Sequence, residues 1–152
     1  MNPRQLTATL IAAATLMGAL SAVHAQERDL TQTAAGVAYV SGGIGIDSRD
    51  ALAAREKDFN FKLVSTIAGT GTYVSHVALT ITSSTGKTFA RHTTEGPLFM
   101  AKLPKGSYTV SATFREQTQT RKFQVEATRL HIEYLRWPAR ADEDWTLPWQ
   151  AP

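Results

Sequence analysis

The sequence predicts an all-β protein, an antiparallel β-sandwich of seven strands, with one short helix near its N-terminus. From Phe59 onward apolar and polar residues alternate with a period of two, which is typical of strands that bury one face. Turn signals rich in Gly, Pro and Ser recur at intervals of about 8–12 residues, as in sandwiches. Threonine is frequent at the polar positions, where its β-branched side chain suits a pleated, solvent-facing surface.

The composition suits one globular domain with a real core. The chain has 152 residues, of which 43% are hydrophobic, and 16 Lys and Arg stand against 13 Asp and Glu. Because the basic residues are dispersed and form no stripe, we expect no nucleic-acid partner. The chain contains no Cys, which excludes thiol nucleophiles, disulfides and Cys-based zinc sites.

Residues 1–25 are predicted to be a secretory signal peptide. Arg4 supplies a positive n-region, residues 6–23 are apolar and uncharged, and Val23-His24-Ala25 precedes the expected cut. The apolar centre is interrupted by Thr, Gly and Ser and is shorter than the roughly 20 residues of a spanning helix. We therefore expect a periplasmic or secreted protein with no stable membrane span after cleavage.

Residues 26–35 are polar and aperiodic, so we expect a flexible leader there. Residues 36–58 combine a short strand around Val37, Tyr39 and Val40, a glycine-rich turn, and the helix. The run from Gly42 to Gly45 lacks the Lys-Ser/Thr and the spacing of phosphate-binding loops. We interpret it as a turn whose glycines adopt positive φ.

The helix is expected over residues 48–58. Asp47 or Ser48 is the expected N-cap, and Asp50 lies in the first turn, where a negative charge suits the helix dipole. Its apolar stripe is thin and consists of Ala51, Leu52 and Arg55.

The sandwich domain is expected over residues 59–137. Residues 103–106, Leu-Pro-Lys-Gly, predict a sharp corner before a long central strand, since Pro presets φ and Gly tolerates the twist of a tight turn. The short fourth strand is expected over residues 98–103. In the other six strands the expected inward-facing residues are Phe59, Phe61, Leu63, Ser65 and Ile67; Val77, Leu79 and Ile81; Phe89; Tyr108, Val110, Ala112 and Phe114; Phe123 and Val125; and Leu130, Ile132 and Tyr134.

Residues 138–152 are expected to form an extended tail, because the alternation stops and proline recurs. Trp145 and Trp149 lie in this tail. Two interpretations stay open. The tryptophans fold back onto the sandwich and cover an apolar patch or a strand edge, or they serve as a handle for a protein or a glycan.

Three segments in order resemble a known family. They are residues 77–86, which begin Val-Ala-Leu-Thr-Ile and end at Gly86, residues 92–96, His-Thr-Thr-Glu-Gly, and residues 103–110, Leu-Pro-Lys-Gly-Ser-Tyr-Thr-Val. Together they are similar to carboxypeptidase regulatory-like domains, relatives of the transthyretin-like and collagen-binding-protein B-type sandwiches. The longer run from residue 39 to residue 114 resembles small secreted proteobacterial proteins that carry this domain. The resemblance implies a transthyretin-like (prealbumin-like) Greek-key sandwich.

The resemblance also suggests three chemistries that the residues do not favour. A Lys–Asn or Lys–Asp isopeptide bond could use Lys62, but residues 129–137 contain no Asn or Asp. Hydrolysis of a urate-like ring implies a C-terminal Tyr-Arg-Gly-Ser, whereas this chain ends Trp149-Gln150-Ala151-Pro152. Zinc or copper binding could use His76, His92 and His131 with Glu133, if alternation places them on one outer face. Unrelated surface histidines are the favoured interpretation, so we expect no enzyme, no cofactor and no metal.

The leading hypothesis is a non-catalytic domain that binds or supports another component of the cell envelope, with a protein as the favoured partner. The predicted contact residues are the exposed aromatic side chains Tyr73, Trp137, Trp145 and Trp149. The alternative is a carbohydrate-binding module. It would use Trp137, Trp145 or Tyr73 as a stacking platform, with Gln117, Gln119 and the threonines as hydrogen-bond donors.

Overall fold

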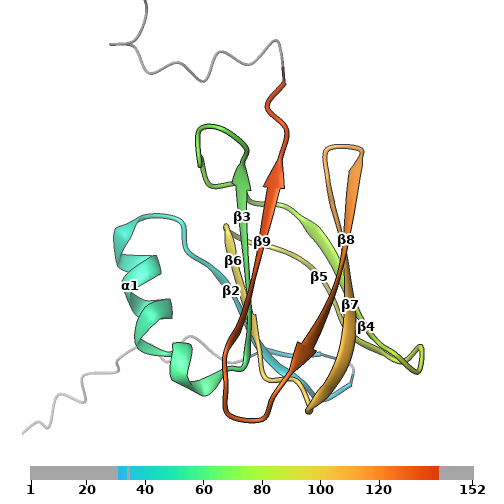
Figure 1. Cartoon of the computed structure of the whole chain (residues 1–152). Helices are drawn as coiled ribbons and strands as arrows, with labels where there is room; N and C mark the ends of the chain where they lie inside the picture. Colours follow the sequence, from blue (N-terminus) through green and yellow to red (C-terminus); the bar gives the residue numbers. More distant parts are fainter. Residues whose placement is uncertain (1–30, 34, 141–152) are drawn as a thin grey trace, which may run out of the picture.

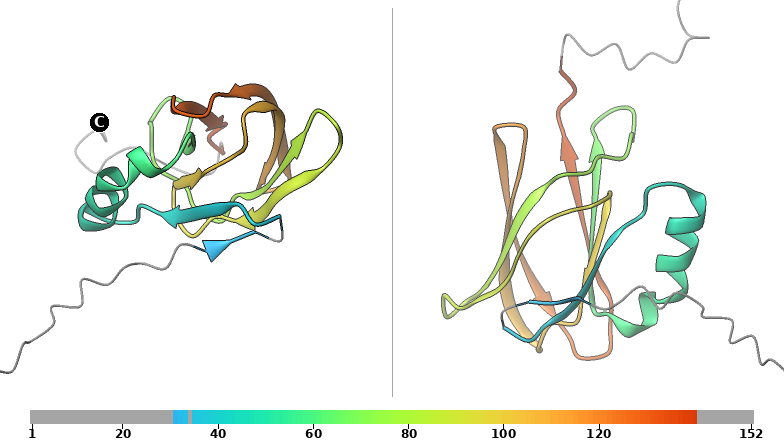
Figure 2. Two further views of the ribbon diagram at one scale, coloured as in Figure 1. Left: turned by 90° about the horizontal axis from the view of Figure 1, so that it is seen from below. Right: turned by 180° about the vertical axis from the view of Figure 1, so that it is seen from behind.

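The computed structural model describes residues 31–33 and 35–140, which form two packed β-sheets with one α-helix (Figure 1). Sheet A has the strand order β1-β2-β6-β3-β9, and sheet B has the order β5-β4-β7-β8. The helix α1 lies against the outer side of sheet A, and no helix covers the outer side of sheet B among the described residues (Figure 2). The expected signal peptide, residues 26–30 of the leader, and the Trp145 and Trp149 segment lie outside the described residues.

Seven described strands correspond to the seven segments predicted from the alternation. They are β3 (Phe61–Ile67), β4 (Ala78–Ser83), β5 (Thr88–Thr93), β6 (Leu98–Ala101), β7 (Gly106–Phe114), β8 (Gln117–Val125) and β9 (His131–Trp137). The strand expected around Tyr39 is β2 (Ala38–Gly42). It pairs with β6 and with the two-residue β1 (Thr31–Gln32), which falls inside the segment expected to be a flexible leader.

One pairing departs from the predicted antiparallel pattern. β9 runs parallel to β3 from the Phe61–His131 pair to the Ile67–Trp137 pair, and both arrows point the same way in Figure 1. The chain leaves sheet B after β8 and enters sheet A at β9, so β9 is not the hairpin partner of β8. The prediction that all strands pair antiparallel was therefore wrong for β3 and β9. The chain crosses from one sheet to the other before β9, and the sequence around this crossover does not indicate the direction of the strand.

The core between the sheets follows the predicted alternation. Inward side chains of β4 and β7 are buried, apart from the partly buried Phe114, and side chains of β3 pack against them from the opposite sheet. Tyr108 also donates a hydrogen bond to the Pro104 carbonyl at 2.7 Å, which ties the corner at residues 103–106 to the strand it opens. The predicted corner is thus confirmed, with Leu103 buried beneath it.

The inward face of β9 was predicted one residue out of register. Ile132 and Tyr134 are 37% and 54% exposed, whereas Leu135 and Trp137 are buried. The reason is the pairing with β3, since residues directly opposite each other share a face. Ser65 and Ile67 point into the core, and their partners Leu135 and Trp137 follow them.

The prediction that Phe89 is the inward-facing residue of β5 was also wrong. Phe89 is only half-buried, while Ala90 is fully buried. Ala90 lies opposite the inward Ile81, and a β-bulge between Ile81 and Thr82 leaves Phe89 without a partner on β4. A bulge changes which residues face inward without leaving an obvious mark in the alternation.

The helical region begins earlier and ends in a different form than predicted. α1 spans Ile46–Ala54, and a 3-10 turn, η1, follows over Glu56–Asp58. Gly45 is the N-cap, with φ of 79°, in place of Asp47 or Ser48, and Asp47 is the acidic residue of the first turn. The Ser48 hydroxyl instead accepts a hydrogen bond from the Gly43 amide at 3.0 Å.

α1 covers sheet A through a second apolar cluster. Of the predicted stripe only Leu52 is buried. The cluster consists of Val40, Leu52, Phe59, Val64, Leu98 and Met100. Because it buries the outer face of β6 and β3, these strands are covered on both sides. Among the described residues, no helix has the length and apolar character needed to cross a bilayer.

Candidate functional site

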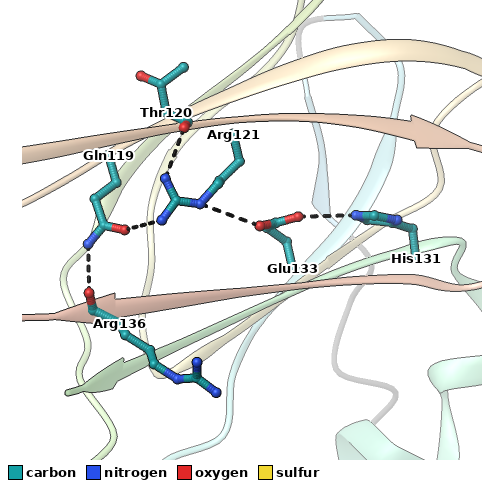
Figure 3. Close-up of polar contacts among 6 residues, drawn as sticks. All are labelled: Gln119, Thr120, Arg121, His131, Glu133 and Arg136. Atoms are coloured by element: carbon teal, nitrogen blue, oxygen red, sulfur yellow. Dashed lines mark hydrogen bonds and ion pairs between the residues drawn. The ribbon is translucent and has the colours of Figure 1, made fainter. Parts of the chain in front are cut away.

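One polar cluster and one exposed apolar surface stand out among the side chains of this fold. The polar cluster bridges the edge strands β8 and β9 and is called the β8–β9 clasp here (Figure 3). Its members are Gln119, Arg121, His131 and Glu133. They come from two segments of β strand that share no backbone hydrogen bonds.

Glu133 is at the centre of the clasp. Its carboxylate lies 3.2 Å from His131 Nε2 and 3.8 Å from Arg121 Nε, and its side chain is only 18% exposed. The Arg121 guanidinium also donates to the Gln119 side-chain oxygen at 3.0 Å and to the Thr120 carbonyl at 3.1 Å. These side chains meet because His131 and Glu133 lie on the same face of β9 as the buried Leu135, and this face points towards sheet B.

The clasp closes an edge of the sandwich. Gln119 Nε2 donates to the Arg136 carbonyl at 2.8 Å and so satisfies a backbone group on the unpaired side of β9. The His131 ring stacks against Phe123 with 5.2 Å between ring centroids. Each contact therefore fastens the edge of one sheet to the edge of the other, which is a structural arrangement. Gln119, predicted as a sugar-binding donor, has its amide engaged here, whereas Gln117 is exposed.

The second feature is an exposed apolar surface on the outer side of sheet A. We call it the apolar surface, and it consists of Ile44, Ile46, Tyr73, Ile132 and Tyr134. These are the large hydrophobic residues exposed in the described part of the chain. Exposed apolar side chains that gather on one side of a monomer mark sites of interaction with other molecules.

Pairing places Tyr73, Ile132 and Tyr134 on the outer side of sheet A, and Ile44 and Ile46 lie at the start of the helix that covers this side. Tyr73 forms an isolated antiparallel bridge with Thr66, so the two side chains share the outer face of β3. The Arg49 guanidinium of α1 lies 5.5 Å from the centre of the Tyr73 ring and connects the helix to this loop. Ile46 opens α1, and Ile44 stands just before it. Ile132 and Tyr134 continue the face onto β9.

Two of the four predicted contact residues, Tyr73 and Trp137, lie in different environments. Tyr73 is 50% exposed and belongs to the apolar surface. Trp137 is 1% exposed and packs against Phe114 in the core, with 5.6 Å between ring centroids. Trp137 was therefore wrong as a partner or sugar contact, because its ring has no free face. Trp145 and Trp149 lie outside the described residues.

The histidines at positions 76, 92 and 131 do not meet on one outer face. His76 is exposed in a loop with φ of 59°, and His92 points inward against Tyr39, with 4.8 Å between ring centroids. His131 belongs to the clasp. No group of three or more His, Cys, Asp or Glu residues in the described segments is arranged to hold a metal ion. The proposed shared face was wrong because His92 lies opposite the inward Leu79 and His131 lies opposite the inward Phe61, so both rings are on the inner side of their sheets.

Burial perturbs two of the ring-bearing groups. Desolvation lowers the pKa of His92 below its ordinary value of 6.5, and the nearby negative charge of Glu95 opposes this shift. Burial raises the pKa of Tyr108 above 10.0. At the surface, a hydrogen bond from Lys105 and its positive charge lower the pKa of Glu126, and the two groups lie 2.9 Å apart.

Lys62 and Asn60 have structural partners. Lys62 Nζ lies 2.7 Å from Glu56 Oε2 of η1, on the side of sheet A that α1 covers. Asn60 is buried and bonds through its side chain to both backbone groups of Leu103 and to the Glu126 carbonyl. The sequence analysis missed this role of Asn60. A lone amide at a strand start was its only available signal.

No protein-family model and no curated protein sequence matches the chain.

Proposed function

We propose that this protein is a non-catalytic periplasmic or secreted β-sandwich domain that binds another protein of the cell envelope through its apolar surface. The observation that carries the proposal is the exposure of Tyr73, Ile132 and Tyr134 on the outer side of sheet A, with the exposed Ile44 and Ile46 at the start of α1. Aromatic side chains are enriched where proteins meet, since a large amphipathic ring buries much area with little loss of freedom.

We also propose that β3–β9 form a Greek-key, transthyretin-like unit of the carboxypeptidase regulatory-like family. Its support is the division of these seven strands into β6-β3-β9 and β5-β4-β7-β8, together with the corner at residues 103–106. In this proposal β1, β2 and α1 are additions at one side of the unit. α1 and the turn before it contribute Ile46 and Ile44 to the apolar surface, so these additions would give this chain its own binding specificity.

The test compares two double variants in quantitative affinity capture from envelope extract. Tyr73→Ser with Tyr134→Ser removes both exposed rings of the apolar surface, and we expect recovery of the specific partner to fall at least about tenfold. Thr80→Val with Ser111→Ala alters the opposite face and is the matched control. Equal recovery with both variants would contradict the proposal, provided that both retain the melting temperature of the unmodified protein.

A second candidate function is glycan binding. The observation that favours it is the outer face of sheet B, which is rich in hydroxyl groups and bare of covering elements in the described residues. This candidate differs from the expected tryptophan platform, because it uses the side chains of the sheet B strands and no tryptophan.

A further inference from the structure

The outer face of sheet B presents hydroxyl groups in rows that cross all four strands. We call it the hydroxyl face. Register aligns its residues in three rows: Thr93, Ala78, Thr113 and Thr118; Arg91, Thr80, Ser111 and Thr120; and Thr88, Thr82, Thr109 and Lys122. Side chains in a row lie about 5 Å from their neighbours, which is the spacing between adjacent strands.

All charged residues on the hydroxyl face are basic. None of the four strands of sheet B contains Asp or Glu. Its outward basic residues are Arg91 on β5 and Lys122 on β8, which are the two edge strands, and both are exposed. Three strand spacings, or about 14 Å, separate the two strands, and the two residues lie in adjacent rows. The large hydrophobic residues exposed in the described part of the chain all lie elsewhere.

Each basic residue stands in a shallow hollow lined with hydroxyl groups. One hollow, of about 510 Å³, is lined by Arg91 with Thr80, Thr93, Ser111 and Thr113. The other, of about 630 Å³, is lined by Lys122 with Ser83, Ser84, Ser107 and Thr109. The repeated combination of one cation with several neutral hydroxyl groups suits a ligand that carries spaced negative charges on a hydroxylated chain.

We infer that the hydroxyl face binds an acidic polysaccharide, with carboxylated sugars of one chain seated in the Arg91 and Lys122 hollows. The inference rests on glycan binding as the second candidate function and names the class of glycan. Arg91 and Lys122 supply charge-assisted hydrogen bonds to carboxylates, and the threonine rows between them exchange hydrogen bonds with sugar hydroxyls. A protein partner fits this face less well, because it lacks exposed aromatic and aliphatic anchors.

The test is binding of the purified protein to polygalacturonate, with neutral dextran and single-stranded DNA as reference polymers, by calorimetry at moderate salt. Arg91→Ala with Lys122→Ala should weaken polygalacturonate binding at least about tenfold, since two charge-assisted contacts are lost. The matched control is Lys57→Ala with Arg136→Ala, which removes the same charge from exposed positions outside the hydroxyl face. It should leave binding within about twofold. Thr80→Val with Ser111→Ala keeps the charge and should weaken binding about threefold or more.

Several results would overturn the inference. Absence of polygalacturonate binding, equal losses in the two charge variants, or an unchanged affinity in the Thr80 and Ser111 variant would each do so. DNA bound as tightly as polygalacturonate would show a general attraction for polyanions. Dextran bound equally well, with sensitivity to Thr80 and Ser111, would keep glycan binding as a function and remove its acidic specificity.

Discussion

The two outer faces of the sandwich are built from the same kind of strand and yet differ in nearly every property. Outward positions of sheet A include Val64, Leu98 and Met100, which α1 covers through Leu52. Outward positions of sheet B carry mainly Thr and Ser, and no helix lies over them in the described residues. A sandwich can therefore have a single core between its sheets while one outer face is suited to apolar contacts and the other to polar contacts.

The largest expected effect tests whether the two faces belong to one cooperative unit. Asn60→Ala should lower the free energy of unfolding by about 3 kcal/mol or more, because it leaves buried backbone groups of Leu103 and Glu126 without partners. Asn60 precedes β3 of sheet A, and its partners flank strands of sheet B. Urea unfolding measures the change, and the exposed Gln124→Ala is the control. A loss below 1 kcal/mol would mean that the two sheets are held together elsewhere.

The next effect compares the faces directly. Leu52→Ala should cost about 2–4 kcal/mol, since it empties a buried site between α1 and sheet A. The outward Thr109→Ala on β7 should cost about 1 kcal/mol or less, which is the span of strand propensity at an exposed face. Thermal and urea unfolding of the pair check both values. Similar costs would erase the distinction between a covered face and a bare one.

A smaller effect is expected at the clasp. Glu133→Gln should cost about 0.5–1 kcal/mol, because the Arg121 side chain is 46% exposed and solvent screens its ion pair. A double-mutant cycle with Arg121→Gln measures the coupling between the two groups. A coupling energy of zero would show that the clasp closes the edge through Gln119 and backbone contacts alone.

The smallest effect is a dependence on pH. Because the pKa of His92 is lowered in the fold, the unfolded chain takes up this proton more readily, and stability should fall as pH drops below about 6.5. His92→Gln should therefore flatten the change in melting temperature between pH 7.5 and 5.5. The exposed His76→Gln is the control and should retain the original slope. A slope in the His92 variant as steep as in the original protein would assign the acid sensitivity to another group.

The strands of this fold were largely predictable, because alternation is local. β4 and β7 each show one clean apolar parity, and both were placed correctly. β9 carries apolar residues at both parities, Ile132 and Tyr134 at one and Leu135 and Trp137 at the other. Only its pairing with β3 decides between them, and that pairing joins segments about 70 positions apart. Leu135 and Trp137 are two large apolar residues spaced by two. This spacing could have indicated that β9 buries the odd-numbered positions.

The candidate surfaces were predictable in part. Threonine at the outward positions of β4 and β7 indicated a solvent-facing sheet, and Tyr73 is exposed as the contact hypothesis required. The meeting of Tyr73 with Arg49, and of Arg121 with Glu133, depends on how distant segments fold together. Sequence spacing carries no record of such contacts. Trp137 was misplaced for the same reason as the rest of β9.

The central claim is that the apolar side of sheet A, rather than the hydroxyl face, holds the protein partner. Hydrogen exchange of the protein with and without its captured partner tests this most directly, because it reports protection residue by residue. We expect new protection in α1, in the loop that carries Tyr73 and in β9, with the exchange of β4, β5 and β7 unchanged. Protection confined to β4, β5 and β7, with α1 and the Tyr73 loop unaffected, would contradict it.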